Sequence, residues 1–137
     1  MIKLIDRLYQ SGFPDFKEII KENINIVIHL AEIKSNFPNI SPEENLLYIW
    51  WPIKDGPLPD TKILNRLADL SVEFLKEGKK LLISCAAGIN RSSLLASLVM
   101  MKFLKINGKE AIDRIRKKNP SALSNENFYH WLIGKKV

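Results

Sequence analysis

Hydrophobic residues follow two different spacings along this chain. Short runs rich in Val, Ile and Leu are typical of buried strands, whereas apolar residues that recur every three or four positions are typical of helices. The runs predict strands at 25–30, 46–51 and 79–84, and a further short strand is expected at 7–10. The periodic segments predict helices at 13–22, 60–78, 91–104, 109–118 and 124–133. The segment 91–104 is apolar nearly all round, so we expect this helix at the centre of the fold.

Residues that start or stop helices support several of these bounds. Asp60 is a good N-cap for the second helix, and Gly78 is a good residue to end it. Pro14 suits the first turn of the first helix, and Ser124 is expected to cap the last one. The second helix carries apolar residues at helical spacing, namely Ile63, Leu67, Leu70 and Phe74.

The order of the elements predicts the fold class. Strands separated by helices favour parallel pairing, so we expect a single α/β domain with a central, mostly parallel sheet of about four to five strands flanked by helices. Two longer connections interrupt the pattern. One is a loop at 31–45 with Pro38 and Pro42, and the other is the turn-rich stretch WPIKDGPLPD at 51–60. Ligands in such folds gather at the carboxyl ends of the strands.

Composition narrows the class of protein. The chain has 137 residues, 46% of them hydrophobic, which suits one folded domain. The longest apolar run, 94–101, is too short for a membrane span, and Asp6 and Arg7 interrupt what would be the apolar part of a signal peptide. A single cysteine excludes an internal disulfide framework and a Cys-rich metal site, and no metal or other cofactor is expected. We expect a reduced, cytoplasmic protein, and the sequence leaves its oligomeric state open.

The charge balance points to anionic partners. The net charge is +6, from 21 basic and 15 acidic residues. Part of this excess clusters at Arg114, Arg116, Lys117 and Lys118, and no aromatic residue is interleaved with them. The cluster is therefore more typical of a solvated helix face than of a platform for nucleic acid.

The only cysteine lies between an expected strand and an expected helix, in SCAAGINRSS at 84–93. The first backbone N–H groups of a helix have no partner inside the helix, and the helix dipole adds positive potential there. The Arg91 guanidinium can bind two oxygens of the same anion. The sequence therefore predicts a phosphate-binding loop whose backbone amides surround a tetrahedral oxyanion, formed by Ala86, Ala87, Gly88, Ile89 and Asn90.

The same surroundings favour the thiolate form of Cys85, which is the nucleophilic form. A nucleophile at the floor of an anion cradle is an arrangement for phosphoryl transfer, and the Ser92 hydroxyl is expected to donate a hydrogen bond to the sulfur. The alternative interpretation is a buried structural cysteine followed by an arginine that caps the helix, because free cysteines are often buried and inert.

The residues from Cys85 to Ser92, CAAGINRS, resemble the C-x5-R-S/T signature of the cysteine-dependent protein phosphatases. The chain as a whole is most similar to the small, atypical dual-specificity phosphatases. RLYQSGFPDF resembles the opening strand and turn of that family, INIVIHL its next core strand, WPIKDGPLPD its general-acid loop, and 107–132 its C-terminal helices. The resemblance implies that residues 1–137 form one catalytic domain of this kind.

The resemblance also implies a role for each matching position. Cys85 would be the nucleophile that forms a phosphocysteine, Arg91 would bind the phosphoryl oxygens, and Ser92 would assist breakdown of the phosphoenzyme. Asp55 would be the general acid that protonates the departing oxygen and then activates water. Asp60 competes for this role, but it already has a structural function as a helix cap. The Asp55-Gly56 pair would also suit a turn.

One position departs from the family pattern. The family usually has a histidine before the nucleophile, where this chain has Ser84. The two histidines, His29 and His130, are interpreted as structural. Asn125 and Phe128 match positions in the last helix of the family, and they are interpreted as loop support and as core, respectively.

The resemblance implies hydrolysis of phosphate monoesters in proteins, of both phosphotyrosine and phosphoserine or phosphothreonine. A chain of 137 residues leaves little room for loops that would deepen the pocket for phosphotyrosine alone. Phosphoinositide phosphatases tend to carry Lys inside the loop, and positions 86–90 hold none. Gly88-Ile89-Asn90-Arg91 matches a core shared with RNA 5′-triphosphatases, so RNA 5′ ends are an alternative substrate. A catalytically weak module that binds phosphate is the second alternative.

Overall fold

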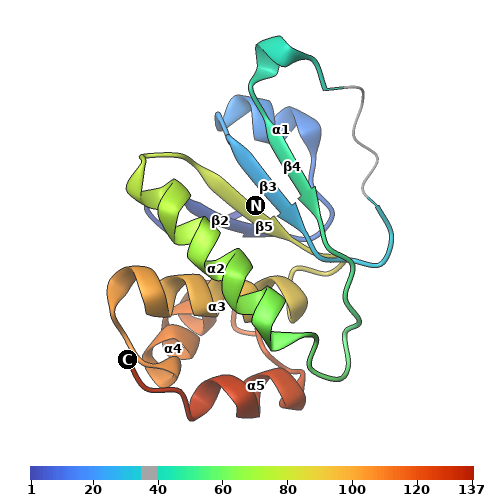
Figure 1. The fold of residues 1–137 in the computed structure, drawn as a ribbon. Coiled ribbons are helices and arrows are strands. Elements are labelled where there is room, and N and C mark those ends of the chain that lie inside the picture. The colour runs from blue at the N-terminus through green and yellow to red at the C-terminus, as the bar shows by residue number, and fades with distance from the viewer. Residues whose placement is uncertain (35–39) are drawn as a thin grey trace.

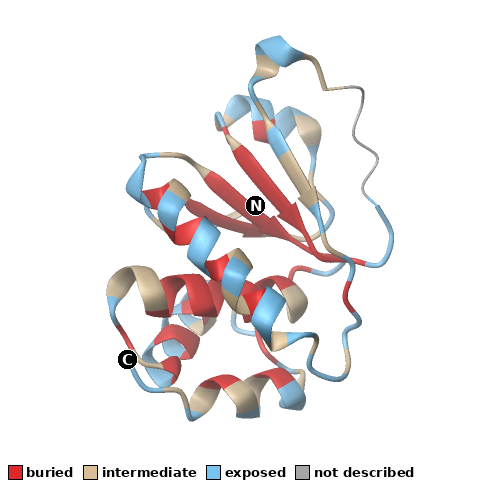
Figure 2. Ribbon diagram, in the orientation of Figure 1, coloured by how far each residue is buried: buried red, intermediate tan, exposed pale blue. Residues whose placement is uncertain are grey.

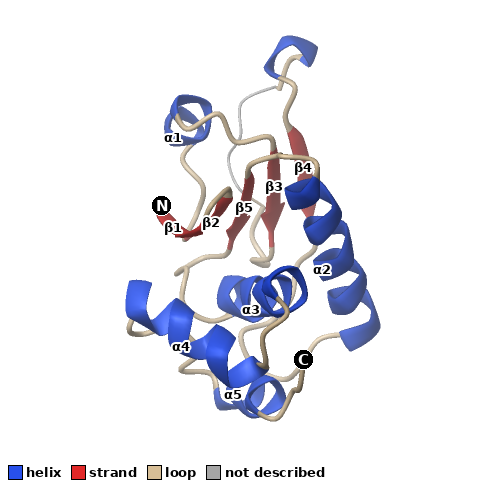
Figure 3. Ribbon diagram, turned by 90° about the vertical axis from the view of Figure 1, so that its left-hand side faces the viewer, coloured by secondary structure: helices blue, strands red, loops and turns tan. Residues whose placement is uncertain are grey.

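The computed structural model describes residues 1–34 and 40–137 of the chain. Its centre is a five-stranded sheet with the order β1-β2-β5-β3-β4, which Figure 3 shows side by side. The strands are β1 (Ile2–Ile5), β2 (Leu8–Ser11), β3 (Ile26–His29), β4 (Leu47–Trp50) and β5 (Leu81–Ser84). The expected α/β fold with a mostly parallel sheet is confirmed.

Strand β5 lies at the middle of the sheet and pairs with β2 and β3 in parallel. Strands β3 and β5 are buried along their whole length (Figure 2), as their runs of Val, Ile and Leu predict. The antiparallel edge strand β1 was not predicted. Only one of its four residues, Leu4, is buried, so the segment carries little of the hydrophobic signal by which strands are found.

Helices cover both faces of the sheet. They are α1 (Phe16–Lys21), α2 (Thr61–Lys76), α3 (Arg91–Leu104), α4 (Gly108–Lys118) and α5 (Glu126–Ile133). In Figure 1, α2 crosses in front of the strands and α1 lies behind them. Ile19 of α1 packs on Tyr9, Val27 and Leu82, which point to one face of the sheet. The alternate strand residues point to the other face, where the larger core is formed with α2 to α5.

The central position of α3 is confirmed, because all of its residues from Ser92 to Met101 are buried. Other helix bounds differ from the prediction by a few residues. Helix α1 begins at Phe16, after Pro14, because the Asp15 side chain caps it by accepting a hydrogen bond from Lys17 N at 3.0 Å. The cap of α5 is Asn125 and not Ser124. The predicted loop at 31–45 contains a short 3-10 helix, η1 (Pro42–Glu44), while Pro38 lies outside the described residues.

Helix α2 has the predicted ends but a different buried face. Asp60 caps it, and Gly78 follows its last turn with a φ of +82°. Two of its four periodic apolar residues, Ile63 and Leu70, are each 39% exposed. The buried face instead consists of Leu64, Ala68, Ser71, Val72 and Leu75. Small residues at positions 68 and 71 allow α2 to approach α3 closely. The predicted face was based on large apolar residues, so these two small residues were not included in it.

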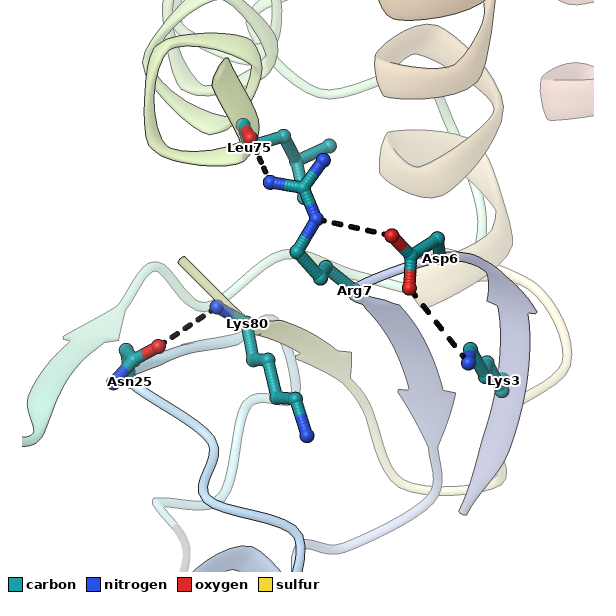
Figure 4. A network of polar contacts seen from close by, with 6 residues as sticks. All are labelled: Lys3, Asp6, Arg7, Asn25, Leu75 and Lys80. Carbon is teal, nitrogen blue, oxygen red and sulfur yellow. Dashed lines mark hydrogen bonds and ion pairs between the residues drawn. The ribbon is translucent and has the colours of Figure 1, made fainter. Parts of the chain in front are cut away.

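The amino ends of the strands are closed by a network of polar contacts, drawn in Figure 4. Arg7, in the turn after β1, donates to the Leu75 carbonyl oxygen of α2 and pairs with Asp6. Asn25 accepts a hydrogen bond from Lys80 N at 2.8 Å. Arg7 ties the start of the sheet to the end of α2, and Asn25 ties the starts of β3 and β5 to each other. The carboxyl ends of the strands are left for the loops that follow β2, β3, β4 and β5.

Candidate active site

Cys85 directly follows the central strand β5, at the carboxyl edge of the sheet. Its backbone N–H donates to the Ser11 carbonyl oxygen at 3.2 Å, so the residue is fixed by the neighbouring strand β2. The side chain is 1% exposed. The loop at 86–90 then leads into α3, which is the strand–loop–helix arrangement that the sequence predicts.

The sulfur of Cys85 lies among hydrogen-bond donors. The backbone N–H of Gly88 donates to Sγ at 3.2 Å. The hydroxyl oxygen of Ser92 lies 3.3 Å from Sγ. When the sulfur is a thiolate, the O–H of Ser92 can donate to it as well, and both contacts then stabilise negative charge on the sulfur. The predicted contact between Ser92 and Cys85 is thus present in the structure.

Gly88 allows the loop to turn back toward the thiol. Its φ is +69°, a region that side chains disfavour. A Cβ at this position would also lie 2.7 Å from Gly12 N and 2.8 Å from the Ser11 carbonyl carbon. The loop therefore packs directly on the backbone that follows β2, and only glycine fits there.

The N-terminus of α3 is left without a side-chain cap. Asn90 occupies the N-cap position, but its side chain makes no hydrogen bond to the first turn. The first N–H groups of α3 therefore stay available to an anion. Ala86 and Ala87 are exposed, and Ile89, Asn90 and Arg91 are half-buried, so the cradle opens to solvent.

Arg91 stands at the edge of this cradle with part of its guanidinium unused. Its Nη1 donates to the Ile53 carbonyl oxygen at 3.1 Å, which ties it to the loop after β4. Its Nε is buried and has no hydrogen-bond partner among the described residues. A buried donor of a charged group without a partner is rare in folded proteins. A bound oxyanion would supply the missing acceptor, and the geometry fits the predicted role of Arg91.

Asp55 lies on the loop between β4 and α2, where it faces the phosphate-binding loop. Its Oδ2 accepts a hydrogen bond from Asn90 Nδ2 at 3.1 Å, and its Oδ1 accepts one from Asn125 Nδ2 at 2.8 Å. Asn125 also donates to the Gly56 carbonyl oxygen at 3.1 Å, which gives it the predicted function of loop support. Asp60 caps α2 through Lys62 N and Ile63 N, so of the two acids only Asp55 contacts the loop that carries Cys85.

A second layer of contacts supports the loop from behind. Asn119 donates to the Gly88 carbonyl oxygen at 2.8 Å, and Leu123 N donates to the Ile89 carbonyl oxygen at 3.0 Å. Leu123 has a φ of +63°, which is unusual for a residue with a branched side chain, and Arg116 holds its carbonyl oxygen at 3.2 Å. The segment after α4 is thus shaped to fit the phosphate-binding loop.

Ser84, at the position where the family usually has histidine, is paired with a histidine from the next strand. His29 Nδ1 lies 2.8 Å from Ser84 Oγ, and His29 Nε2 lies 3.0 Å from the Ile33 carbonyl oxygen. Since a carbonyl only accepts, Nε2 carries the proton and the Ser84 hydroxyl donates to Nδ1. Burial lowers the pKa of His29; the hydrogen bond to Ile33 opposes this shift and the positive charge of Arg91 adds to it. A neutral imidazole therefore fixes the residue next to the nucleophile.

The structure brings all of the predicted site residues together at one edge of the sheet: Cys85, the loop at 86–90, Arg91, Ser92 and Asp55. It adds Gln10, which the sequence did not point to, together with two unpredicted contacts: His29 with Ser84, and the Asn90 side chain with Asp55. Gln10 is fully buried on β2 and contacts Ser92. Its only sequence signal is a polar residue directly after the apolar pair Leu8-Tyr9.

The comparisons with known proteins agree with this geometry. Residues 8–136 match the family described as dual specificity phosphatase, catalytic domain. The chain belongs to the dual specificity phosphatase family. The resemblance noted in the sequence is therefore confirmed for nearly its whole length.

Named relatives of the family are similar at about the same level. The chain is 31% identical over 138 residues to human dual specificity protein phosphatase 16, covering 96% of this chain and 20% of that protein. It is 30% identical over 115 residues to tyrosine-protein phosphatase vhp-1 of Caenorhabditis elegans, covering 81% of this chain and 17% of that protein. The chain spans half or less of the length of the first curated relatives that it matches.

A solved structure has a closely similar fold although its sequence is much less similar. Human tyrosine phosphatase-like serine/threonine/tyrosine-interacting protein superposes with a TM-score of 0.80, at 19% identity, covering 96% of this chain and 92% of that one. At this identity the likeness concerns the fold alone.

Two features of the described residues concern metal ions and membranes. Over residues 1–34 and 40–137, no group of three or more His, Cys, Asp or Glu side chains is arranged to hold a metal ion. Within the same described part of the chain, no helix is long and apolar enough to cross a lipid bilayer.

Proposed function

We propose that this protein hydrolyses phosphate monoesters of proteins, on phosphotyrosine and on phosphoserine or phosphothreonine, through a phosphocysteine on Cys85. Membership of the dual specificity phosphatase family supports the reaction. The observation that carries it is a buried thiol that accepts a hydrogen bond from the Gly88 N–H, on a loop that ends at Arg91, whose buried Nε has no hydrogen-bond partner among the described residues. We extend the proposal to residues 1–137 as one catalytic domain.

In the first step the Cys85 thiolate attacks phosphorus, the bond from phosphorus to the leaving oxygen breaks, and Asp55 gives its proton to that oxygen. Arg91 and the free N–H groups at the start of α3 bind the phosphoryl oxygens as their charge redistributes. In the second step water attacks phosphorus and gives a proton to Asp55. The phosphorus–sulfur bond breaks, and its electron pair stays on sulfur as the thiolate, which releases inorganic phosphate and restores the enzyme.

Both alternatives from the sequence have a specific test. An RNA 5′-phosphatase would use the same cradle, so it differs only in its substrate. A module that binds phosphate without turnover would keep the cradle and lose the chemistry. The contacts of Asp55 with Asn90 and Asn125 favour turnover, because binding alone needs no acid at this position.

The chemistry also requires a reduced thiol, so we place the protein in the cytoplasm. Thiolates are oxidised easily, and the chain has no second cysteine that would trap a sulfenic acid as an internal disulfide. A reducing compartment keeps Cys85 in the form that the proposed reaction needs.

The test compares wild type with Cys85→Ser in metal-free, reducing buffer. Phosphotyrosine and phosphoserine peptides, p-nitrophenyl phosphate and an RNA with a 5′-triphosphate are offered as separate substrates. We expect wild type to release phosphate from both peptides faster than from RNA, and Cys85→Ser to be inactive. Faster release of phosphate from RNA than from either peptide would mean that the substrate is RNA and not protein. Folded wild type that binds vanadate and turns over none of the four would identify a binding module.

A further inference from the structure

Gln10 is a buried polar residue in the middle of the sheet. It lies on β2, next to Ile83 of the central strand β5, and none of its surface is exposed. Leu8, two residues earlier on the same face of the sheet, packs into the core with α3. An amide buried among apolar side chains is unfavourable unless its donors find acceptors. The partners of Gln10 therefore indicate what this residue does.

The Gln10 amide nitrogen reaches two serine hydroxyls at the start of α3. Its Nε2 lies 3.0 Å from Ser92 Oγ and 2.5 Å from Ser93 Oγ, one contact for each of its two N–H bonds. Ser92 Oγ in turn lies 3.3 Å from Cys85 Sγ. A continuous line of polar contacts thus runs from β2 through the first turn of α3 to the nucleophile.

The direction of these bonds determines where the Ser92 proton points. A hydroxyl has one proton to donate, and a donated N–H occupies one of its oxygen lone pairs. A serine in the first turn of a helix would otherwise donate to a nearby backbone carbonyl. The carbonyl four residues before Ser92 belongs to Gly88, and it already accepts a hydrogen bond from Asn119. Among the described residues, the Ser92 hydroxyl contacts Gln10 Nε2 and Cys85 Sγ; with Gln10 donating to its oxygen, its own proton is directed toward the sulfur.

We propose that Gln10 is a positioning residue for the second half of the reaction: it orients the Ser92 hydroxyl toward Cys85 and so speeds breakdown of the phosphocysteine. This rests on the proposed function. When the phosphorus–sulfur bond breaks, the electron pair moves onto sulfur, and the Ser92 O–H donates to the charge as it forms. In the first step the sulfur loses charge, so the same hydrogen bond gives no acceleration there.

This difference between the two steps separates positioning from a merely structural role. Loss of the Gln10 donor should slow release of phosphate from the enzyme and leave formation of the phosphocysteine nearly unchanged. A residue that only holds the fold would affect both steps together, or would affect only the temperature of unfolding.

The test is rapid mixing of wild type, Gln10→Met and Gln10→Asn with p-nitrophenyl phosphate, following p-nitrophenolate. Met has similar length and no donor, and Asn keeps an amide that is too short to reach both serines. For either variant we expect a burst of about one product per enzyme at close to the wild-type rate, followed by a steady-state kcat lower by roughly ten- to hundredfold, the value of one hydrogen bond to a charged group. The ratio kcat/KM should change by less than about twofold, because it reports the steps up to phosphocysteine formation.

Two further variants serve as controls. Ser97→Ala changes a serine that is also buried in α3 but has no hydrogen-bond partner among the described residues, and it should retain wild-type kinetics. Ser92→Ala should show the burst, and adding Gln10→Met to it should slow breakdown no further, since both changes remove the same donor to sulfur.

Parallel falls in the burst rate and in kcat, or an unchanged or faster kcat in a folded Gln10→Met variant, would overturn the proposal. A faster kcat would mean that the Gln10 amide accepts from Ser92 and draws its proton away from sulfur. These results differ from a failure of the proposed function, in which wild type itself would release no p-nitrophenolate.

Discussion

Two arginines, at opposite edges of the same sheet, differ in how their donors are used. At the amino edge, Arg7 contacts the Leu75 carbonyl oxygen and the Asp6 carboxylate (Figure 4). At the carboxyl edge, Arg91 contacts the Ile53 carbonyl oxygen through Nη1, and its buried Nε has no partner in the part of the chain that the structure describes. Arg7 thus connects structural elements, whereas Arg91 is held in place by one donor and keeps its Nε available to a ligand.

The same contrast applies to the helices at these edges. At the amino edge of the sheet, the last turn of α2 receives the Arg7 side chain on one of its carbonyls. At the carboxyl edge, the first turn of α3 receives no side-chain cap, and the Asn90 side chain that stands nearest bonds to Asp55. Polar groups that are satisfied within the chain indicate structure, and buried polar groups that are left over indicate where a ligand completes the site.

The sharpest way to break this comparison is to make the same substitution at both arginines. Arg91→Lys should lower kcat/KM for p-nitrophenyl phosphate by about a thousandfold, because a point charge cannot replace the planar pair of donors on the phosphoryl group. Steady-state kinetics measures kcat/KM, and a thermal melt measures the melting temperature, for both variants. Arg7→Lys should lower the melting temperature and leave kcat/KM within about twofold of wild type. Equal effects of the two changes on activity would contradict the contrast.

The two candidate acids give a second matched pair. Asp55→Asn should lower kcat by about a hundredfold on alkyl phosphates, which need a proton on the leaving oxygen, and much less on p-nitrophenyl phosphate. Asp60→Ala removes the cap of α2 and should lower the free energy of unfolding by about 1 kcal/mol with activity retained. A greater loss of activity in Asp60→Ala than in Asp55→Asn would reassign the acid.

A third comparison concerns the asparagines that cap helices. Asn125→Ser keeps a side-chain oxygen for the N-terminus of α5 but is too short to donate to Asp55. We expect kcat/KM on alkyl phosphates to fall by about tenfold, because Asp55 loses one of the two hydrogen bonds that hold its carboxylate in position. Asn107 caps α4 through Glu110 N, so Asn107→Ser is the matched change at a helix cap with no contact to Asp55. Asn107→Ser should leave the kinetics unchanged. A similar loss of kcat/KM in both variants would mean that the effect comes from weaker helix capping and not from the contact with Asp55.

The smallest expected effect is on the pH dependence of stability. Burial lowers the pKa of His29 below its ordinary value of 6.5, so below that pH the unfolded chain binds a proton that the folded chain does not. The free energy of unfolding should therefore fall as the pH drops below about 6.5, by at most about 1.4 kcal/mol per pH unit from this group. Urea unfolding between about pH 5 and pH 7.5 measures the slope.

His29→Asn should flatten this slope. At pH values above the sloping range it should lower the free energy of unfolding, because Ser84 loses a hydrogen-bond partner. A slope that persists in His29→Asn would assign the pH dependence to other groups.

The sequence alone was enough to predict the parts of the site that are contiguous along the chain. Cys85, the loop at 86–90, Arg91 and Ser92 lie within one strand–loop–helix segment, and Asp55 lies in a stretch marked by its prolines. The parallel sheet also followed from the alternation of elements. Strand β1 was missed because it is a short edge strand with a single buried residue.

The parts that escaped prediction depend on how distant strands align. Gln10 and Ser92 are 82 residues apart, and His29 and Ser84 are 55 residues apart. Each pair meets only because β2 and β3 both flank β5 in a particular register. No local pattern encodes that register, and a buried polar residue in a strand reveals its role only when its partner is known.

The most direct test of the account is to trap the phosphocysteine. Wild type is mixed with a phosphotyrosine peptide and quenched in acid within one turnover, and the digested protein is examined by mass spectrometry. The account predicts one phosphate on the peptide that carries Cys85, none in Cys85→Ser, and more of it in Gln10→Met than in wild type. Release of inorganic phosphate by wild type without any phosphate on that peptide, or equal turnover by Cys85→Ser, would contradict it.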